Sequence, residues 1–282
     1  MLRADQPRGQ HMSVAEPTFS VSTLPSRSLA WAARGWFAIA LAGQWLFAVY
    51  ILLALVQPLA LGDGDAVNRT GLITGHVAGD GVGNGVLLAH VLAAALLSLG
   101  GLLQLLPWLR RHWPAWHRWA GRGFMVLSLA GAGSGLFLVW VRGSRLGDAS
   151  AMAVTLNGVL IVVAAAMAWR LARQRRFAGH RRWAIRALLL VSGVWTMRLG
   201  FMAWFILNQG PRGNTPRMDG WFDIAWSFGC YLLPLAVAEL YFRAERAGPA
   251  VRRAVAAVLA SGALLTALGV FGAWRMMWGP HL

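Results

Sequence analysis

Residues 85–106 read GVLLAHVLAAALLSLGGLLQLL, an apolar run without a single charged residue. A bilayer core about 30 Å thick needs roughly 20 helical residues to cross it, and this run is long enough. Six further apolar runs of similar length occur along the chain. The seven predicted spans cover residues 31–56, 85–106, 120–141, 151–170, 183–207, 221–242 and 252–274. We therefore predict an all-α, polytopic membrane protein, a bundle of seven transmembrane helices.

The composition supports the same class. Of the 282 residues, 57% are hydrophobic and only 13% are charged, a balance typical of membrane proteins and not of soluble domains. The formal charge of +16 would suggest nucleic acid as the partner of a soluble protein. Here the basic residues lie at the ends of the spans, where they meet anionic headgroups. We expect the lipid bilayer as a partner and no nucleic acid.

The arginines predict the orientation. Nineteen lie in or beside the N-terminal tail and the second, fourth and sixth loops, whereas six lie in the other loops and the C-terminal tail. Because positive residues stay on the cytoplasmic side, the N-terminus is expected inside and the C-terminus outside a bacterial cytoplasmic (inner) membrane. Residues 1–30 are predicted as a disordered cytoplasmic tail, 31–274 as a single transmembrane domain and 275–282 as a short external tail.

One short motif occurs twice. Residues 116–122 read WHRWAGR and residues 179–186 read GHRRWAIR, each at the expected cytoplasmic start of a span. This recurrence indicates either an internal repeat relating residues 85–141 to residues 151–207, or one interfacial anchor used twice.

A resemblance to a known family rests on residues 88–198. His90 lies in an apolar span, residues 100–124 read GGLLQLLPWLRRHWPAWHRWAGRGF, and residues 179–199 read GHRRWAIRALLLVSGVWTMRL. This pattern resembles the DUF2306 family of predicted prokaryotic membrane proteins, which has no established activity. The histidine-bearing helices are also similar in style to b-type membrane cytochromes such as the cytochrome b561 and ferric reductase groups. Unlike a two-haem cytochrome, this chain has no span with two histidines.

The first candidate site lies at the cytoplasmic ends of the third and fifth spans. His117 and His180 are expected to face each other and ligate one haem b as neutral imidazoles, with arginines binding its propionates. His90 is a further candidate ligand, but it lies too far along the helix axis to share that iron. The alternative is that this cluster contacts lipid phosphates. The arginines proposed for haem binding are Arg118, Arg122, Arg181 and Arg186.

The second candidate site consists of polar groups inside the spans, which are costly in a bilayer and therefore indicate function. Such groups at matched depth predict an outer cavity for a small anionic or polar solute, in which Asp223 or a bound anion neutralises Arg198. A quinone is expected instead with the electron-transfer function, bound by arginines. The alternative is an interhelical hydrogen-bond network without a ligand. The proposed members are His90, Gln44, Asn157, Arg198 and Asp223.

The sequence contains no catalytic motif of a known reaction class, so whether the protein is an enzyme stays open. We favour a haem-binding electron-transfer protein of cytochrome b561-like character. The alternatives are a transporter or small-ligand-binding protein with an outer cavity at His90, Asn157 and Arg198, or a structural or assembly role.

Overall fold

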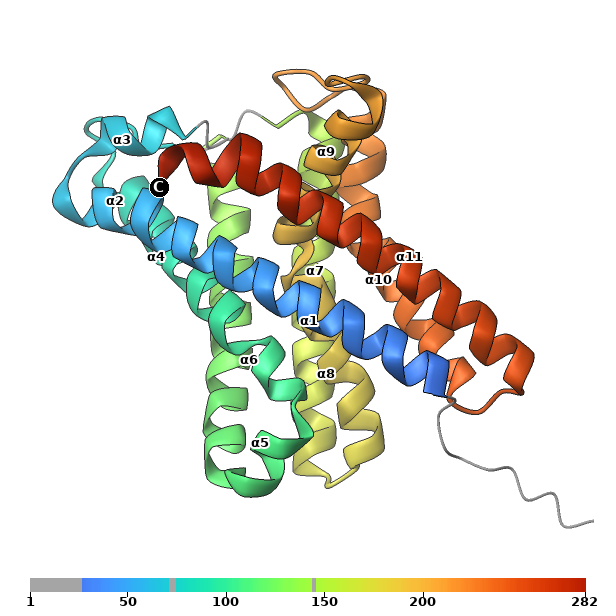
Figure 1. The fold of residues 1–282 in the computed structure, drawn as a ribbon. Helices are drawn as coiled ribbons and strands as arrows, with labels where there is room; N and C mark the ends of the chain where they lie inside the picture. The colour runs from blue at the N-terminus through green and yellow to red at the C-terminus, as the bar shows by residue number, and fades with distance from the viewer. Residues whose placement is uncertain (1–26, 71–74, 144–145) are drawn as a thin grey trace, which may run out of the picture.

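The structure is a computed structural model that describes residues 27–70, 75–143 and 146–282. Within these ranges every regular element is a helix (Figure 1). Six helices are long and apolar enough to cross a membrane, and one bent helix pair makes a seventh span. The prediction of an all-α bundle with seven membrane-spanning segments is confirmed.

The first span is longer than predicted. It consists of α1 (Arg27–Tyr50), a π-helical segment (Ile51–Val56) and α2 (Gln57–Leu61), which continue as one helix of 35 residues. The helix ends at Gly62, whose φ of +79° is a left-handed conformation that glycine adopts without steric cost.

The loop after the first span folds back onto the bundle. Its short helix α3 (Gly64–Arg69) is capped by Asp63, whose Oδ1 accepts a hydrogen bond from the backbone N–H of Ala66 at 2.9 Å. Val67 on α3 is fully buried and belongs to the main hydrophobic core. This loop therefore covers one end of the bundle.

The second and third spans are joined by a short helix. α4 (Gly81–Gly100) ends in a 3₁₀ turn (Leu102–Leu105), followed by α5 (Pro107–His112) and α6 (Pro114–Leu136). Proline opens both α5 and α6, because the first helical turn does not need its missing N–H. A π-helical segment (Phe137–Val141) completes the third span.

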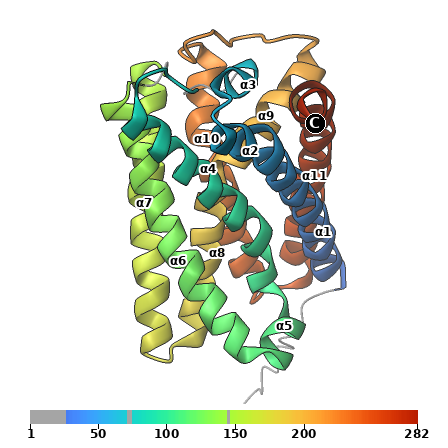
Figure 2. The ribbon, with the colours of Figure 1, turned by 90° about the vertical axis from the view of Figure 1, so that its left-hand side faces the viewer.

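The fourth span is α7 (Asp148–Arg173), which packs against both α6 and α8 (Phe177–Val191), as Figure 2 shows. The fifth span is predicted at the right place but as one straight helix. Instead, α8 and α9 (Gly193–Asn208) meet at 54°, with Ser192 between them.

The last two spans are α10 (Trp221–Ala244) and α11 (Pro249–Ala273). α11 lies beside α1 and runs in the same direction, and together they cross the other helices obliquely (Figure 1). Helical structure continues through Trp274–Trp278 and Gly279–His281.

The two predicted tails differ in outcome. Most of the N-terminal tail, residues 1–26, lies outside the described residues, and its last part already belongs to α1. In the predicted tail of residues 275–282, helical structure continues as far as His281, and Trp278 there is fully buried. An aromatic core contact therefore orders this segment.

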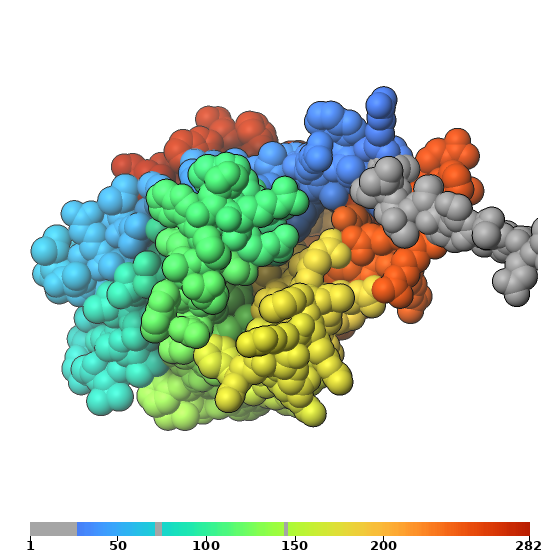
Figure 3. Space-filling view, turned by 90° about the horizontal axis from the view of Figure 1, so that it is seen from below, coloured from blue at the N-terminus to red at the C-terminus, as the bar shows by residue number. Residues whose placement is uncertain are grey.

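The chain has two electrostatically different ends. We call the end formed by α5, the starts of α6 and α8, and the α10–α11 turn the arginine-rich end, because most arginines lie there. Figure 3 shows it from below, with α5–α6 in green beside the α7–α8 turn in yellow. The opposite end, with α3 and the end of α9, is the arginine-poor end.

The contact between α9 and α11 depends on Gly269. A Cβ atom added there would lie 2.6 Å from the carbonyl oxygen of Leu199 and 2.7 Å from its Cβ. We expect Gly269→Ala to lower the free energy of unfolding by about 1–3 kcal/mol, because the backbone of α9 must move. Denaturation in mixed detergent micelles measures the change.

The matched control is Gly262→Ala on the same helix, where an added Cβ would meet nothing within 4 Å. This substitution should leave stability unchanged or raise it by about 0.5–1 kcal/mol, because alanine favours the helical backbone. Equal effects of the two substitutions would contradict the close α9–α11 contact.

Candidate functional site

Arg198 is a cation within a membrane span. It lies on α9, six residues beyond Ser192, and its surface is partly exposed. Its guanidinium donates a hydrogen bond to the Val194 carbonyl at 3.2 Å, and its Cζ lies 5.4 Å from the centre of the Phe47 ring. Among the described residues, no carboxylate forms an ion pair with Arg198.

His90 lies on α4, where its ring packs against α6. Its Nδ1 is 2.8 Å from Oγ of Ser134, whose hydroxyl donates to the carbonyl of Ala130 at 2.7 Å. The serine oxygen therefore accepts a hydrogen bond from Nδ1–H, which leaves Nε2 of the neutral ring as an acceptor. An added Cβ on Gly135 would lie 3.3 Å from the His90 ring, so this glycine lets the ring pack against α6.

Phe47, on which Arg198 lies, belongs to a group of three packed aromatic residues. Trp278 packs against Phe47 and Tyr50 with ring centres 5.4 and 6.3 Å apart, and Phe47 stacks on Tyr50 at 6.4 Å. Tyr50 is itself within electrostatic range of Arg198. The indole Nε1 of Trp278 is buried and has no hydrogen-bond partner in the described part of the chain. We call Phe47, Tyr50 and Trp278 the aromatic cluster.

Gln44 and Asn157 form a different group, at the bend between α8 and α9. Nε2 of Gln44 donates to Oγ of Ser192 at 2.8 Å, and Nδ2 of Asn157 donates to the carbonyl of Leu190 at 3.2 Å. These two amides therefore satisfy polar groups at the break. The residues predicted to line one outer cavity thus lie in two groups, one at the bend and one around Arg198.

Asp223 does not neutralise Arg198, and that part of the prediction is wrong. Its carboxylate is buried and accepts hydrogen bonds from Nδ2 of Asn214 at 2.6 Å and from the backbone N–H groups of Thr215 at 2.8 Å and Gly220 at 3.1 Å. Asp223 caps α10 and fixes the preceding loop. Of the two predicted partners of Arg198, a bound anion remains.

The two histidines of the repeated motif both lie at the arginine-rich end. His117 and His180 are each the fourth residue of their helix, α6 and α8. Nδ1 of His180 lies 2.9 Å from the carbonyl oxygen of Ala168, so it donates that hydrogen bond. His117 makes no hydrogen bond through its ring to another described residue.

The four arginines proposed around this pair have different partners. Arg181 binds both carboxylate oxygens of Glu245, at 2.8 and 3.2 Å. Nε of Arg186 donates to Glu239 at 2.7 Å. Arg122 lies over the Trp119 ring, with its Cζ 4.6 Å from the ring centre, and Arg118 is exposed. Two of the four are thus already paired with carboxylates.

Sequence reasoning missed two features. The aromatic cluster depends on the helical continuation to Trp278, and a tryptophan near a span end is typical of a membrane-interface belt. The ion pair between Arg142 and Asp80, at 2.8 Å, joins the end of the third span to the start of α4. The charges of these two residues are the only sequence signal for this pair.

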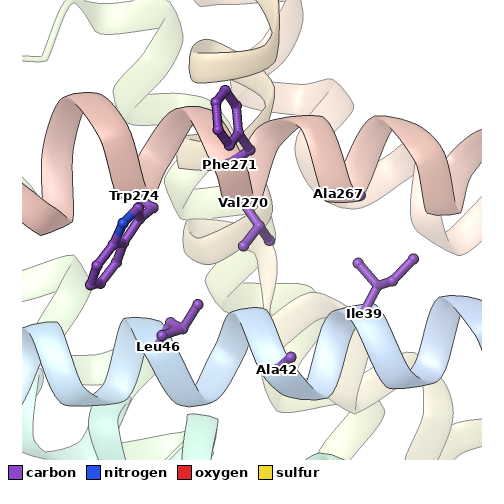
Figure 4. A pocket seen from close by; sticks show the side chains of 7 residues that line it. All are labelled: Ile39, Ala42, Leu46, Ala267, Val270, Phe271 and Trp274. Atoms are coloured by element: carbon purple, nitrogen blue, oxygen red, sulfur yellow. The ribbon is translucent and has the colours of Figure 1, made fainter.

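An apolar groove lies away from these residues. It is a groove of about 410 Å³ between α1 and α11, seen in Figure 4. Its lining is entirely apolar or aromatic and includes Leu46 and Phe271, both exposed. In a membrane-spanning bundle, lipid acyl chains are the natural occupants of such a groove.

We expect Asp223→Ala to lower the free energy of unfolding by about 1–3 kcal/mol, because three donors lose a charged acceptor. Asp148→Ala is the control, since this exposed aspartate in the first turn of α7 has only a helix-dipole contribution of about 0.3–1 kcal/mol. Denaturation in mixed micelles compares the two variants. A stability loss for Asp223→Ala no larger than for Asp148→Ala would contradict the capping role.

Comparison with known protein families finds a match to one family model. The model of a family described as "Predicted membrane protein (DUF2306)" matches residues 87–242, more than half of the chain, in agreement with the resemblance in the sequence. No curated protein and no solved structure matches the chain.

Proposed function

The chain belongs to the DUF2306 family of predicted membrane proteins. We propose that this multi-pass membrane protein binds haem b and transfers electrons. The proposed axial ligands are His117 and His180. The proposal rests on one observation: two histidines, each the fourth residue of its own helix, lie at the same end of the bundle.

The donor set suits haem iron. A bis-imidazole site takes one neutral ring nitrogen from each histidine, on opposite faces of the macrocycle. The hydrogen bond from Nδ1 of His180 to the Ala168 carbonyl fixes the tautomer and leaves Nε2 free to act as a ligand. His117 has no competing hydrogen bond from its ring to the described residues.

The surroundings of the two histidines suit a flat macrocycle. One helical turn after His117 lies Gly121, where an added Cβ would meet only the side chain of Gln104, at 3.6 Å. One turn after His180 lies Ala184, another small residue. α6 and α8 are linked through α7, which packs against both. Small side chains one turn after both histidines suit a planar ligand at this end of the bundle better than bulky ones would.

The arginine assignments for haem change in light of the ion pairs. Arg181 and Arg186 already bind glutamates, so they are poorer candidates for propionate binding than the sequence suggests. Arg110 and Arg118 both lie within electrostatic range of His117. We assign the propionate contacts to these two residues, because Arg binds carboxylates through parallel hydrogen bonds. Bound haem would supply a one-electron redox centre.

The test is the absorption spectrum of detergent-purified protein, first oxidised and then reduced with dithionite. We expect a Soret band that shifts on reduction, and we expect His117→Ala and His180→Ala each to lose most of it, because each variant removes one iron ligand. The controls are His112→Ala, which changes an exposed histidine stacked on Trp108, and His90→Ala. Both controls should retain the band.

Two results would overturn the proposal. One is a featureless spectrum from protein made in haem-replete cells. The other is a Soret band that survives both His117→Ala and His180→Ala but disappears in His90→Ala, because the iron would then lie in the other half of the bundle.

A further inference from the structure

We propose that residues 107–122, which join the second and third spans, form a docking surface for anionic phospholipids of the leaflet at the arginine-rich end. The segment consists of α5, the turn at Trp113 and the first turns of α6, and we call it the α5–α6 segment. Its positive charge without any carboxylate and its exposed tryptophans carry this assignment. The surface requires neither histidine of the haem proposal.

The α5–α6 segment is basic and has no acidic residue near it in the sequence. Residues 81–147 contain neither Asp nor Glu. The arginines of the segment are all exposed, and none forms an ion pair with another described residue. Two of them lie four residues apart on α6, a spacing at which like charges repel. These arginines are Arg110, Arg111, Arg118 and Arg122.

The rest of the arginine-rich end has no carboxylate to spare. In the described part of the chain, the acidic residues at this end are Glu239 and Glu245. They already pair with Arg186 and Arg181 of α8, at 2.6 and 2.8 Å. The other described acidic residues precede or begin helices at the arginine-poor end. The counter-charge of the α5–α6 segment therefore comes from outside the described chain.

Exposed tryptophans favour a membrane surface over a soluble anion. Trp108, Trp113 and Trp119 are 59%, 58% and 69% exposed, and all three lie within twelve residues of sequence. Indole rings prefer the headgroup level of a bilayer, where the apolar ring and the polar N–H are both accommodated. Cζ of Arg122 lies 4.6 Å from the centre of the Trp119 ring, so cation and indole share one patch. A soluble phosphate would interact with the arginines alone.

The location of the segment suits a headgroup contact. It follows the second span directly and opens the third, at the face of the bundle that Figure 3 shows. Clusters of about four to eight basic residues beside a span are typical of anionic-lipid binding. The occupant that we infer is a phospholipid with net negative charge, such as phosphatidylglycerol. Its phosphate meets the arginines while its acyl chains stay in the bilayer.

The experiment measures lipid selectivity at this surface in reconstituted protein. A donor fluorophore is attached to Ala115→Cys, at an exposed position in the first turn of α6, and the natural Cys230 is buried. The phosphatidylcholine vesicles contain a trace of acyl-labelled phosphatidylglycerol or, as the control, of acyl-labelled phosphatidylcholine. We expect at least about twofold greater energy transfer to phosphatidylglycerol. High salt should remove this preference, because the screening length falls to about 3 Å at 1 M.

A double substitution tests the arginines without changing those assigned to the haem propionates. Arg111→Gln with Arg122→Gln removes two charges from the segment and leaves Arg110 and Arg118 in place. We expect this protein to lose most of its preference for phosphatidylglycerol. The matched control is Arg246→Gln with Arg253→Gln, which removes two charges from exposed positions after α10 and at the start of α11, at the same end. The control should keep the preference.

Three results would overturn the docking surface. They are equal transfer to the two lipids in the unaltered protein, an equal loss of preference in the two double variants, and loss of the preference when soluble glycerol phosphate is added at the concentration of the labelled lipid. The salt dependence of the unaltered protein tests the surface even if a double variant fails to fold. The haem spectrum of Arg111→Gln with Arg122→Gln should be unchanged, which separates the two proposals.

Discussion

The bend at Ser192 is the feature on which the rest of the bundle depends. In hydrocarbon, a backbone polar group without a partner is costly, so a 54° break within a span requires side chains that satisfy the freed groups. Gln44 from α1 and Asn157 from α7 supply hydrogen bonds there. Gly193 allows the close approach, because an added Cβ would lie 3.1 Å from Nδ2 of Asn157. Three spans are thus joined at one point.

The same bend separates the two candidate sites. His180 precedes Ser192 by twelve residues and Arg198 follows it by six, which correspond to about 18 Å and about 9 Å of helix. No small ligand reaches from one site to the other. α8 therefore contributes to chemistry at the arginine-rich end, whereas α9 contributes to the surroundings of the aromatic cluster. Because the two halves point in different directions, one span can serve both sites.

The positions of the seven spans could be predicted because they follow from local properties. Length and hydropathy decide whether a segment crosses a bilayer, and every apolar run in the sequence forms a helix. The bend could not be predicted, since a Ser-Gly pair is also compatible with a straight helix. Asp223 shows a second limit. The membrane depth that the sequence predicts for Asp223 suggested that it pairs with Arg198. In the structure, its partners include backbone N–H groups of a folded loop.

The distribution of charge gives Arg198 its significance. The chain has 26 basic and only ten acidic residues, so most arginines must find their counter-charge in lipid headgroups or solvent. At the ends of the bundle those sources are close. Arg198 is within a span and lies over the Phe47 ring, where electrostatic interactions are less screened. Among the described residues no carboxylate pairs with it, so its guanidinium depends on the Val194 carbonyl and on the face of the Phe47 ring.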